Sequence, residues 1–494
     1  MNILLVLRTL GNLLILLSGI LIVPFGVSYC YGTREEIWAF AITIIASGAT
    51  GLALKFSLKP ENEDITIREG LAIVTFWWIS CALFGALPYW FSGACDTFCD
   101  SYFESMSGFT TTGASIFNDI EALPNGILFW RSMTQWLGGM GIVVFFVAIL
   151  STIGVGGHKL FSAEAPDLTT DKIKPRIAQT AKILWVIYLS LTAILIPLLW
   201  LGGMELFDAV CHAFTTVSTG GFSTKNLSIA AYDNLFIEIV LMVFMFIAAC
   251  NFILYYQLVT GRIKKVLMNS ELRFFAGLIL CAICLVTLAL FFFNANDYNG
   301  GVKDHKFDTI GGSLRYAAFQ TISIMTSAGY CNADFDIWPN FCRVFLVLLM
   351  FIGGCAGSTA GGMKVARIML LFRSGIRELV HVIRPRAIMH VKLSGKPVSE
   401  DIITNTLGFV VIHLGLLGVF SLILTIFGTE LITSFSAVAS MMSNVGPALA
   451  DAGATKNYSG FAYPCKWVLA FSMLVGRLEI YTVILIFMPL TWKK

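Results

Sequence analysis

The feature that most constrains this chain is a series of apolar runs, each long enough to cross the hydrocarbon core of a bilayer as one helix. Charged residues make up 13% of the 494 residues, well below their usual share in soluble domains. Lipid must therefore cover most of the outer surface, and we predict an all-α polytopic membrane protein. Hydropathy gives about ten spans, at residues 3–27, 37–56, 71–92, 126–152, 180–203, 234–260, 273–293, 341–372, 404–427 and 464–490.

The positive charges predict how these spans are oriented. Lys and Arg gather in alternate loops, which the positive-inside rule places in the cytoplasm together with both termini. The first apolar run is longer than that of a signal peptide and lacks a small-x-small cleavage site, so it is predicted to be a retained span. The basic stretches are residues 55–68, 159–176, 262–265, 373–396 and 493–494.

The loops on the opposite side are acidic, which leaves two interpretations open. The charges are either ordinary solvated loop residues or a funnel that concentrates cations at an entrance. They are Asp96, Asp100, Glu104, Asp119, Glu121, Asp233, Asp334 and Asp336.

The twelve cysteines form no pattern of metal ligands. Cys281 and Cys284 make a CxxC inside an apolar run, which predicts two membrane-buried thiols rather than a redox or zinc site. Cys95 and Cys99 lie in a predicted outer loop, where a disulfide between them is possible.

Four polar segments between the spans follow one pattern. Each comes after a short apolar helix and carries a glycine among small residues. If Gly113, Gly221, Gly329 and Gly446 are equivalent, the spacings are 221 − 113 = 108, 329 − 221 = 108 and 446 − 329 = 117 residues, although Gly220 could replace Gly221. The segments are FTTTGAS (109–115), TVSTGGFS (216–223), MTSAGYC (325–331) and MSNVGPA (442–448), after short helices at 95–108, 206–217, 313–325 and 431–442.

This period accommodates two spans with a re-entrant segment between them. We therefore predict four fused repeats around a central pore, each with a first span, a pore loop and a second span. A two-helix hairpin precedes them. The predicted divisions are residues 1–60 for the hairpin and 61–160, 161–265, 266–380 and 381–494 for the repeats.

The four segments, called the filter segments below, suit a dehydrated monovalent cation. Glycine opens backbone angles that let successive carbonyls face one axis, where a carbonyl ring can replace an ion's hydration shell. The segments hold no carboxylate, which disfavours a divalent site. One of them alone would suit an ordinary polar turn, whereas four in register favour a pore. The predicted cation-binding residues are Thr110, Thr111, Thr112, Gly113, Ser218, Thr219, Gly220, Gly221, Thr326, Ser327, Ala328, Gly329, Ser443, Asn444, Val445 and Gly446.

A second unusual stretch, IGGCAGSTAGGMK at residues 352–364, interrupts the second span of the third repeat. We call it the third-repeat loop, because so many glycines disfavour a continuous helix. Close packing of small residues is the alternative. The stretch departs from a phosphate-binding loop, since no glycine precedes Lys364 and no Ser or Thr follows it. Arg477 lies within the last span and must find partners there, for which we predict carbonyls freed in 353–362. The predicted gate is Gly353, Gly354, Gly357, Ser358, Thr359, Gly361, Gly362 and Arg477.

The filter segments and the third-repeat loop resemble those of the Trk/Ktr/HKT superfamily of K⁺ transporters over residues 70–490. The additional N-terminal pair of spans is similar to its TrkH/TrkG branch. The resemblance implies gated K⁺ uptake across a bacterial inner membrane, with the four glycines lining the filter. Plant relatives that prefer Na⁺ carry serine at the first glycine, so Gly113 implies K⁺ preference. In the family, the loop and the matching arginine obstruct the cytoplasmic half of the pore.

The resemblance also implies partners. These are a second copy of the chain in a homodimer, TrkA-like nucleotide-binding subunits in the cytoplasm, and membrane lipid. The chain has no dinucleotide fingerprint, so no organic cofactor is expected within it, and its charge of +3 does not suggest nucleic acid. Two alternatives are the membrane subunit of a K⁺ pump of the KdpA type and a secondary transporter of another small solute. An enzyme is disfavoured, since neither HExxH nor GxSxG occurs.

Overall fold

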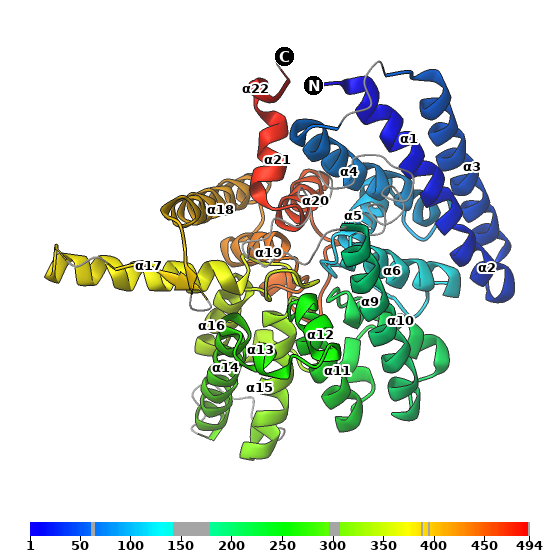
Figure 1. The fold of residues 1–494 in the computed structure, drawn as a ribbon. Helices are drawn as coiled ribbons and strands as arrows, with labels where there is room; N and C mark the ends of the chain where they lie inside the picture. The colour runs from blue at the N-terminus through cyan, green and yellow to red at the C-terminus, as the bar shows by residue number, and fades with distance from the viewer. Residues whose placement is uncertain (61–64, 142–176, 296–306, 387–388, 394–395, 493–494) are drawn as a thin grey trace.

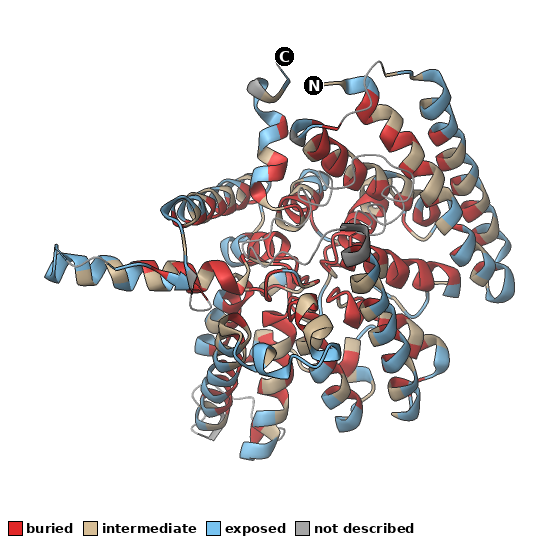
Figure 2. Cartoon of the chain, viewed as in Figure 1, coloured by how far each residue is buried: buried red, intermediate tan, exposed pale blue. Residues whose placement is uncertain are grey.

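The computed structural model describes residues 1–60, 65–141, 177–295, 307–386, 389–393 and 396–492. Within these ranges the regular structure is helical, apart from a short ribbon of β1 (Lys392–Leu393) and β2 (Lys396–Pro397). Among the described residues, six helical stretches are long and apolar enough to cross a membrane, α1 and α2 counting as one, or up to eight if two bent pairs each count as one span. Buried residues gather toward the middle of the molecule and exposed residues lie around its edge (Figure 2). The prediction of an all-α polytopic membrane protein is confirmed.

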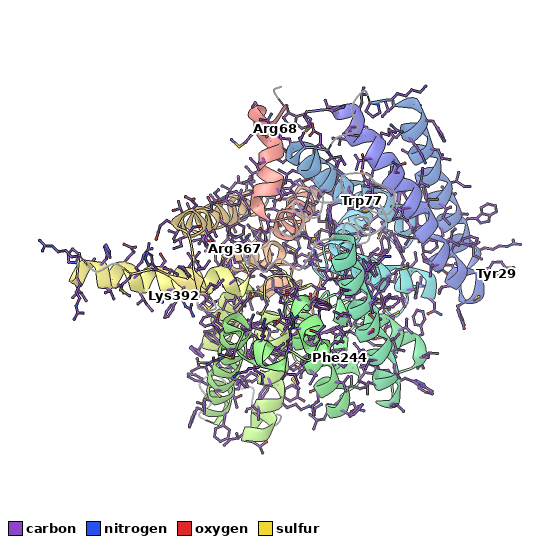
Figure 3. All side chains as sticks on the ribbon, viewed as in Figure 1. Tyr29, Arg68, Trp77, Phe244, Arg367 and Lys392 are labelled. Carbon is purple, nitrogen blue, oxygen red and sulfur yellow. The ribbon has the colours of Figure 1, made fainter. Side chains whose placement is uncertain are left out.

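The N-terminal hairpin consists of α1 (Ile3–Ile20), α2 (Ile22–Tyr31) and α3 (Arg34–Ser57). Its helices cross closely at two glycines, since a Cβ atom at Gly51 would lie 2.7 Å from the carbonyl oxygen of Gly11. Glu36 completes a capping box with Thr33 and also accepts the backbone N–H of Gly126 at 3.0 Å. One buried carboxylate thus caps α3 and joins the hairpin to the first repeat. Tyr29, near the end of α2, points away from the molecule (Figure 3).

The rest of the described chain contains a motif that occurs four times: a long first helix, a short pore helix, a filter segment and a second helix (Figure 1). The first helices are α4 (Ile67–Phe91), α9 (Ile177–Leu201), α14 (Ser270–Ala295) and α18 (Glu400–Ile426). The pore helices are α5 (Phe98–Phe109), α10 (Leu206–Val217), α15 (Ile310–Met325) and α19 (Leu431–Met442).

The second helices begin with α6 (Asn125–Gly139), α11 (Leu235–Ala248), α16 (Asn340–Met350) and α20 (Tyr463–Arg477). Each pore helix packs on the second helix of the preceding repeat: α10 on α6, α15 on α11, α19 on α16 and α5 on α20. This order of contacts is cyclic, so the four repeats close around a common centre.

The second helices do not run straight. In the second repeat α11 is followed by α12 (Phe252–Val259) at 95°, and in the fourth α20 is followed by α21 (Ile480–Phe487) at 118°. In the third repeat the chain between α16 and α17 (Val365–Ile383) is the third-repeat loop. The predicted spans 234–260 and 464–490 are therefore bent helix pairs, each of which can still count as one broken span. Both stretches are mostly apolar, but each has polar residues at its bend, Asn251 in the first and Arg477 and Glu479 in the second.

The remaining short elements are α13 (Ile263–Leu267), α22 (Pro489–Trp492) and the 3₁₀ turns η1 (Ser228–Ala231), η3 (Phe335–Ile337) and η4 (Ala450–Ala452). The predicted divisions after residues 265 and 380 fall inside α13 and α17, and the division after residue 60 lies between α3 and α4. The division after residue 160 and the second half of the span 126–152 lie outside the described residues. The domain boundaries stay predictions.

Candidate functional site

Each pore helix ends with the same pair of backbone hydrogen bonds, which turn the chain into its filter segment. In the first repeat the N–H of Thr112 donates to the Ser107 carbonyl at 2.9 Å, and that of Thr111 donates to Gly108 at 3.0 Å. These two bonds form a Schellman motif, in which the second residue after the helix adopts a left-handed conformation. Equivalent pairs of bonds end α10, α15 and α19.

The left-handed position is not a glycine in any of the four motifs. Its φ angle is 53° at Thr111, 54° at Thr219, 54° at Ser327 and 52° at Asn444. Such angles cost a β-branched residue free energy and persist only where the surroundings impose them, as at functional sites. Fourfold repetition of one strained conformation indicates that the turn itself is required.

Two residues further on, each segment contains a glycine that no other residue could replace without a steric clash. The φ angles are 81° at Gly113, 76° at Gly221, 75° at Gly329 and 99° at Gly446. Gly220 does not share this conformation, so Gly221 is the equivalent residue in the second repeat.

The four glycines lie against one another's loops in a closed ring. A Cβ atom at Gly113 would lie 2.1 Å from the carbonyl oxygen of Gly220, and one at Gly221 would lie 1.9 Å from that of Ala328. The same holds for Gly329 against Val445 at 1.9 Å and for Gly446 against Thr112 at 2.5 Å. Repeats one to four thus contact in order, and the fourth returns to the first.

Side chains of the filter segments complete this arrangement. Thr110 and Thr112 share a hydroxyl hydrogen bond of 2.8 Å, and the Asn444 amide donates to Thr112 at 2.9 Å. The hydroxyls of Thr111 and Ser443 are buried without a partner. The hydroxyls of Ser218 and Thr326 bond to carbonyls of their own pore helices. All sixteen predicted filter residues therefore lie at or beside the ring.

The third-repeat loop lies directly against the inner side of this ring. The N–H of Gly361 donates to the Ser327 hydroxyl at 2.6 Å, and a Cβ atom at Gly361 would lie 2.4 Å from the Ser443 carbonyl. The Thr359 hydroxyl donates to the carbonyl of Val217 at 3.2 Å. The loop thus touches residues adjoining or within three of the four filter segments.

The loop is also bound to the broken second helix of the second repeat. The N–H of Cys355 donates to the carbonyl of Ala249 at 2.9 Å, and that of Phe252 donates to Gly357 at 3.0 Å. Glu271, at the start of α14, accepts the N–H of Ala356 at 2.8 Å. These bonds satisfy backbone groups that have left a helix at membrane depth. Positive φ angles at Gly353, Gly357 and Gly362 allow the path, and Gly354 and Ser358 lie in contact inside it.

Arg477, the last residue of α20, joins three repeats. Its guanidinium donates to the carbonyl of Thr359 at 2.8 Å, as predicted, and to that of Gly139 at 2.9 Å and of Gly138. Close by in sequence, Glu479 forms an ion pair with Arg367 of α17 at 2.6 Å. Arg367 lies inside the molecule in Figure 3. The positive charge of Arg477 therefore lies beside the third-repeat loop and is hydrogen-bonded to it.

Sequence reasoning missed three residues that hold these loops. Gln135 of α6 donates to the Gly220 carbonyl at 2.7 Å and accepts the N–H of Phe222 at 3.0 Å, so it brackets the second filter segment. Asn251 caps α12 at the break in the second repeat, and Glu271 anchors the third-repeat loop. A polar residue inside an apolar run was the signal available at Asn251 and Gln135.

The outer acidic residues need a correction. Glu104 lies on α5 with no exposed surface, bonded to Arg131 at 2.7 Å, and Asp100 pairs with Lys466 at 2.6 Å. These two are neither solvated loop charges nor a funnel. Asp96, Asp119, Glu121 and Asp233 are exposed, whereas Asp334 and Asp336 are half-buried. All twelve cysteines fall in the described ranges and all are free, so the Cys95–Cys99 disulfide is absent.

The fold and the ring define a class: a polytopic membrane protein in which four pore-loop repeats in one chain enclose a common centre. The chain belongs to the TrkH family, described as cation transport proteins, whose family model matches residues 36–493. This confirms the resemblance inferred from the filter segments.

Named relatives cover nearly the whole chain. The "Trk system potassium uptake protein TrkH" of Salmonella typhimurium is 39% identical over 490 residues, 99% of each chain. The "Trk system potassium uptake protein TrkG" of Escherichia coli is 33% identical, covering 98% of this chain and 97% of that protein. The crystal structure of the potassium transporter TrkH from Vibrio parahaemolyticus superposes with a TM-score of 0.87 at 35% identity, over 100% of both chains.

Proposed function

We propose that this protein takes up K⁺ through a gated, channel-like pore across a bacterial inner membrane. The closed ring of four glycine-containing filter segments carries this proposal, and the relatives named as potassium uptake proteins support it. The membrane potential supplies the driving force, about 2.3 kcal/mol per charge for each 100 mV, so the chain requires no energy-coupling domain of its own.

The filter residues supply neutral oxygens to a cation that has lost its water. The alternating left-handed and glycine conformations turn the backbone repeatedly, which presents carbonyls from four segments to one region. The partnerless hydroxyls of Thr111 and Ser443 add two buried oxygens beside the ring. The pore helices also end at the ring, where the negative ends of their dipoles favour a cation. K⁺ is the cargo, and no organic cofactor is involved.

The arrangement of the third-repeat loop corresponds to a closed gate. The loop lies in contact with the filter segments at Ser327 and Ser443, and Arg477 places a cationic group beside it. A passing K⁺ would meet both a steric and an electrostatic barrier. Opening requires the loop to leave its bonds to Ser327, Val217 and Ala249.

Two features support the proposed orientation and partners. The loops 55–60 and 262–265 are rich in Lys and Arg. By the positive-inside rule we assign them, together with both termini, to the cytoplasm. Helix α17 projects from the bundle (Figure 1), with apolar side chains exposed up to 80% at Val382. An exposed apolar face of this kind calls for a partner. We assign it to a second copy in a homodimer, with TrkA-like nucleotide-binding subunits beneath.

Uptake of ⁸⁶Rb⁺ into proteoliposomes tests the proposal. We expect uptake driven by an inside-negative potential, with unlabelled K⁺ competing far better than Na⁺ or Li⁺. Equal competition by all three ions would contradict a K⁺ filter. Uptake that persists without a potential and requires a cosubstrate gradient would favour a secondary transporter instead.

A further inference from the structure

A second set of contacts lies behind the filter segments, on the side away from the ring. The residue nine positions before the filter glycine points from each of the first three pore helices toward the chain that leaves the ring. In the three repeats this residue is Glu104, His212 and Gln320, and each is fully buried. None belongs to the predicted filter or gate.

The first contact uses a carboxylate. Glu104 accepts the N–H of Ile116 at 2.9 Å and the hydroxyl of Ser115 at 3.1 Å, two residues that follow Gly113. Arg131 pairs with Glu104 at 2.7 Å and donates to the carbonyl of Ser223 at 3.0 Å. The bond to Ser223 extends the contact into the second repeat.

The second contact uses a neutral imidazole at the same place. His212 Nε2 lies 3.0 Å from the hydroxyl of Ser223, and its Nδ1 lies 2.8 Å from the carbonyl of Asp208. A carbonyl only accepts, so Nδ1 carries the proton and Nε2 accepts from Ser223. Ser223 follows its glycine by two residues, as Ser115 does in the first repeat.

The third and fourth repeats make weaker versions of the same contact. The Gln320 amide donates to the carbonyl of Ala333 at 3.3 Å. In the fourth repeat the equivalent residue is Ala437, and the preceding Ser436 accepts the N–H of Leu449 at 3.2 Å. Leu449 follows Gly446 by three residues, as Ile116 follows Gly113.

The inner end of each filter segment is held by a Schellman motif. Its outer end is held by side chains of its own pore helix, which besides these include Asp208, bonded to Thr224 at 2.7 Å, and Ser323, bonded to the Tyr330 carbonyl at 2.7 Å. A carbonyl ring discriminates between ions only if its oxygens keep their places when the ion changes. We propose that these side chains, called the struts below, are positioning residues that set K⁺ over Na⁺ discrimination. The struts are Glu104 with Arg131, His212, Gln320 and Ser436.

This proposal rests on the filter assignment and adds a graded prediction. The first strut is ionic, fully buried and shared between two repeats, so its loss should affect discrimination most. The third is a single neutral bond, and its loss should affect discrimination least. A symmetric filter with four equivalent supports would show no such order.

The test uses purified full-length protein in proteoliposomes and measures the ratio of Na⁺ to K⁺ concentrations that halve ⁸⁶Rb⁺ uptake. Gln320→Leu is the cleanest variant, because the Gln320 Oε1 atom is buried without a partner and no charge is stranded. We expect the ratio to fall about threefold in Gln320→Leu and tenfold or more in the double variant Glu104→Gln/Arg131→Met. The double change removes the buried charge from both partners, which preserves folding better than either single change.

The matched control is the pair Glu238–Arg315, which joins α11 to α15 at 2.8 Å. Its one other ion pair in the described chain is that of Arg315 with Asp233 at 2.8 Å, next to the start of α11 and twelve residues beyond Gly221. Glu238→Gln/Arg315→Met should lower the melting temperature and leave the ion ratio unchanged. Gly113→Ser is measured alongside. An altered ratio in Gly113→Ser with normal ratios in the strut variants overturns the strut proposal alone. An unaltered ratio in Gly113→Ser overturns the filter assignment and the struts with it.

Discussion

Replacing Arg477 by alanine tests the gate most directly. Of its three carbonyl partners, only Thr359 belongs to the third-repeat loop, while Gly138 and Gly139 lie at the end of α6. A hydrogen bond from a charged donor contributes roughly 1.5–3 kcal/mol. If opening breaks the bond to Thr359, its loss shifts the closed-to-open equilibrium about tenfold to a hundredfold, since about 1.4 kcal/mol corresponds to a factor of ten.

The assay is ⁸⁶Rb⁺ flux per inserted molecule, with and without cytoplasmic partner subunits. We expect Arg477→Ala to raise flux at least several-fold without the partners, because the closed state is weakened and a positive charge leaves the ion path. Arg477→Lys keeps the charge but loses the planar fork that reaches several carbonyls. Its flux should therefore lie between those of Arg477→Ala and the unaltered protein.

A structural role for Arg477 predicts the reverse result. Three carbonyls would lose their donor, the yield of folded protein would fall, and flux per molecule would drop in both conditions. Arg343→Ala, which removes a pair with Asp336 at 2.9 Å on the outer side, controls for the loss of an arginine. A rise in flux in that control as well would show that the effect is not specific to the gate.

Three further outcomes are expected. Gly113→Ser should lower K⁺ over Na⁺ discrimination and also the melting temperature, because its Cβ atom would lie 2.1 Å from the Gly220 carbonyl oxygen and the ring must open. Flux competition measures the discrimination and thermal unfolding measures the melting temperature. Unchanged values of both would refute the ring. Gly329→Asp should abolish Rb⁺ flux or make it sensitive to divalent cations, whereas full flux would remove the third segment from the pore. The N–H of Cys355 bonds to the carbonyl of Ala249, the residue before Cys250, and both thiols are free. Oxidation by copper phenanthroline should therefore form a disulfide between Cys250 and Cys355 that lowers flux until a reducing agent is added. Cys355→Ser should be insensitive, and equal inhibition of that variant would contradict the cross-link.

The pore helices and filter segments could be predicted from the sequence because the same pattern occurs four times. A period near 108 residues places equivalent glycines without any knowledge of tertiary contacts. The choice between Gly220 and Gly221 could not be made in this way, since it depends on a φ angle that both glycines permit. The structure assigns the left-handed angle to Gly221.

The breaks in the second and fourth repeats could not be predicted from hydropathy. Hydropathy measures how apolar a stretch is, whereas these breaks involve hydrogen bonds to other repeats. In the second repeat the carbonyl of Ala249 bonds to Cys355, and in the fourth the Arg477 side chain bonds to Thr359 and Gly139. The burial of Glu104 could not be predicted from the sequence for a related reason. Its partner Arg131 lies on another helix, and an acidic residue beside a predicted outer loop looks the same in sequence whether solvated or paired.

The third-repeat loop has a consequence for how such a protein can be assembled. In a ring of four identical subunits, every feature of one subunit occurs four times around the axis. The third-repeat loop already contacts residues adjoining or within three filter segments, so three further copies of it would compete for the same volume. Joining the four quarters in one polypeptide frees each of them to diverge, and a single quarter can then supply the plug for all.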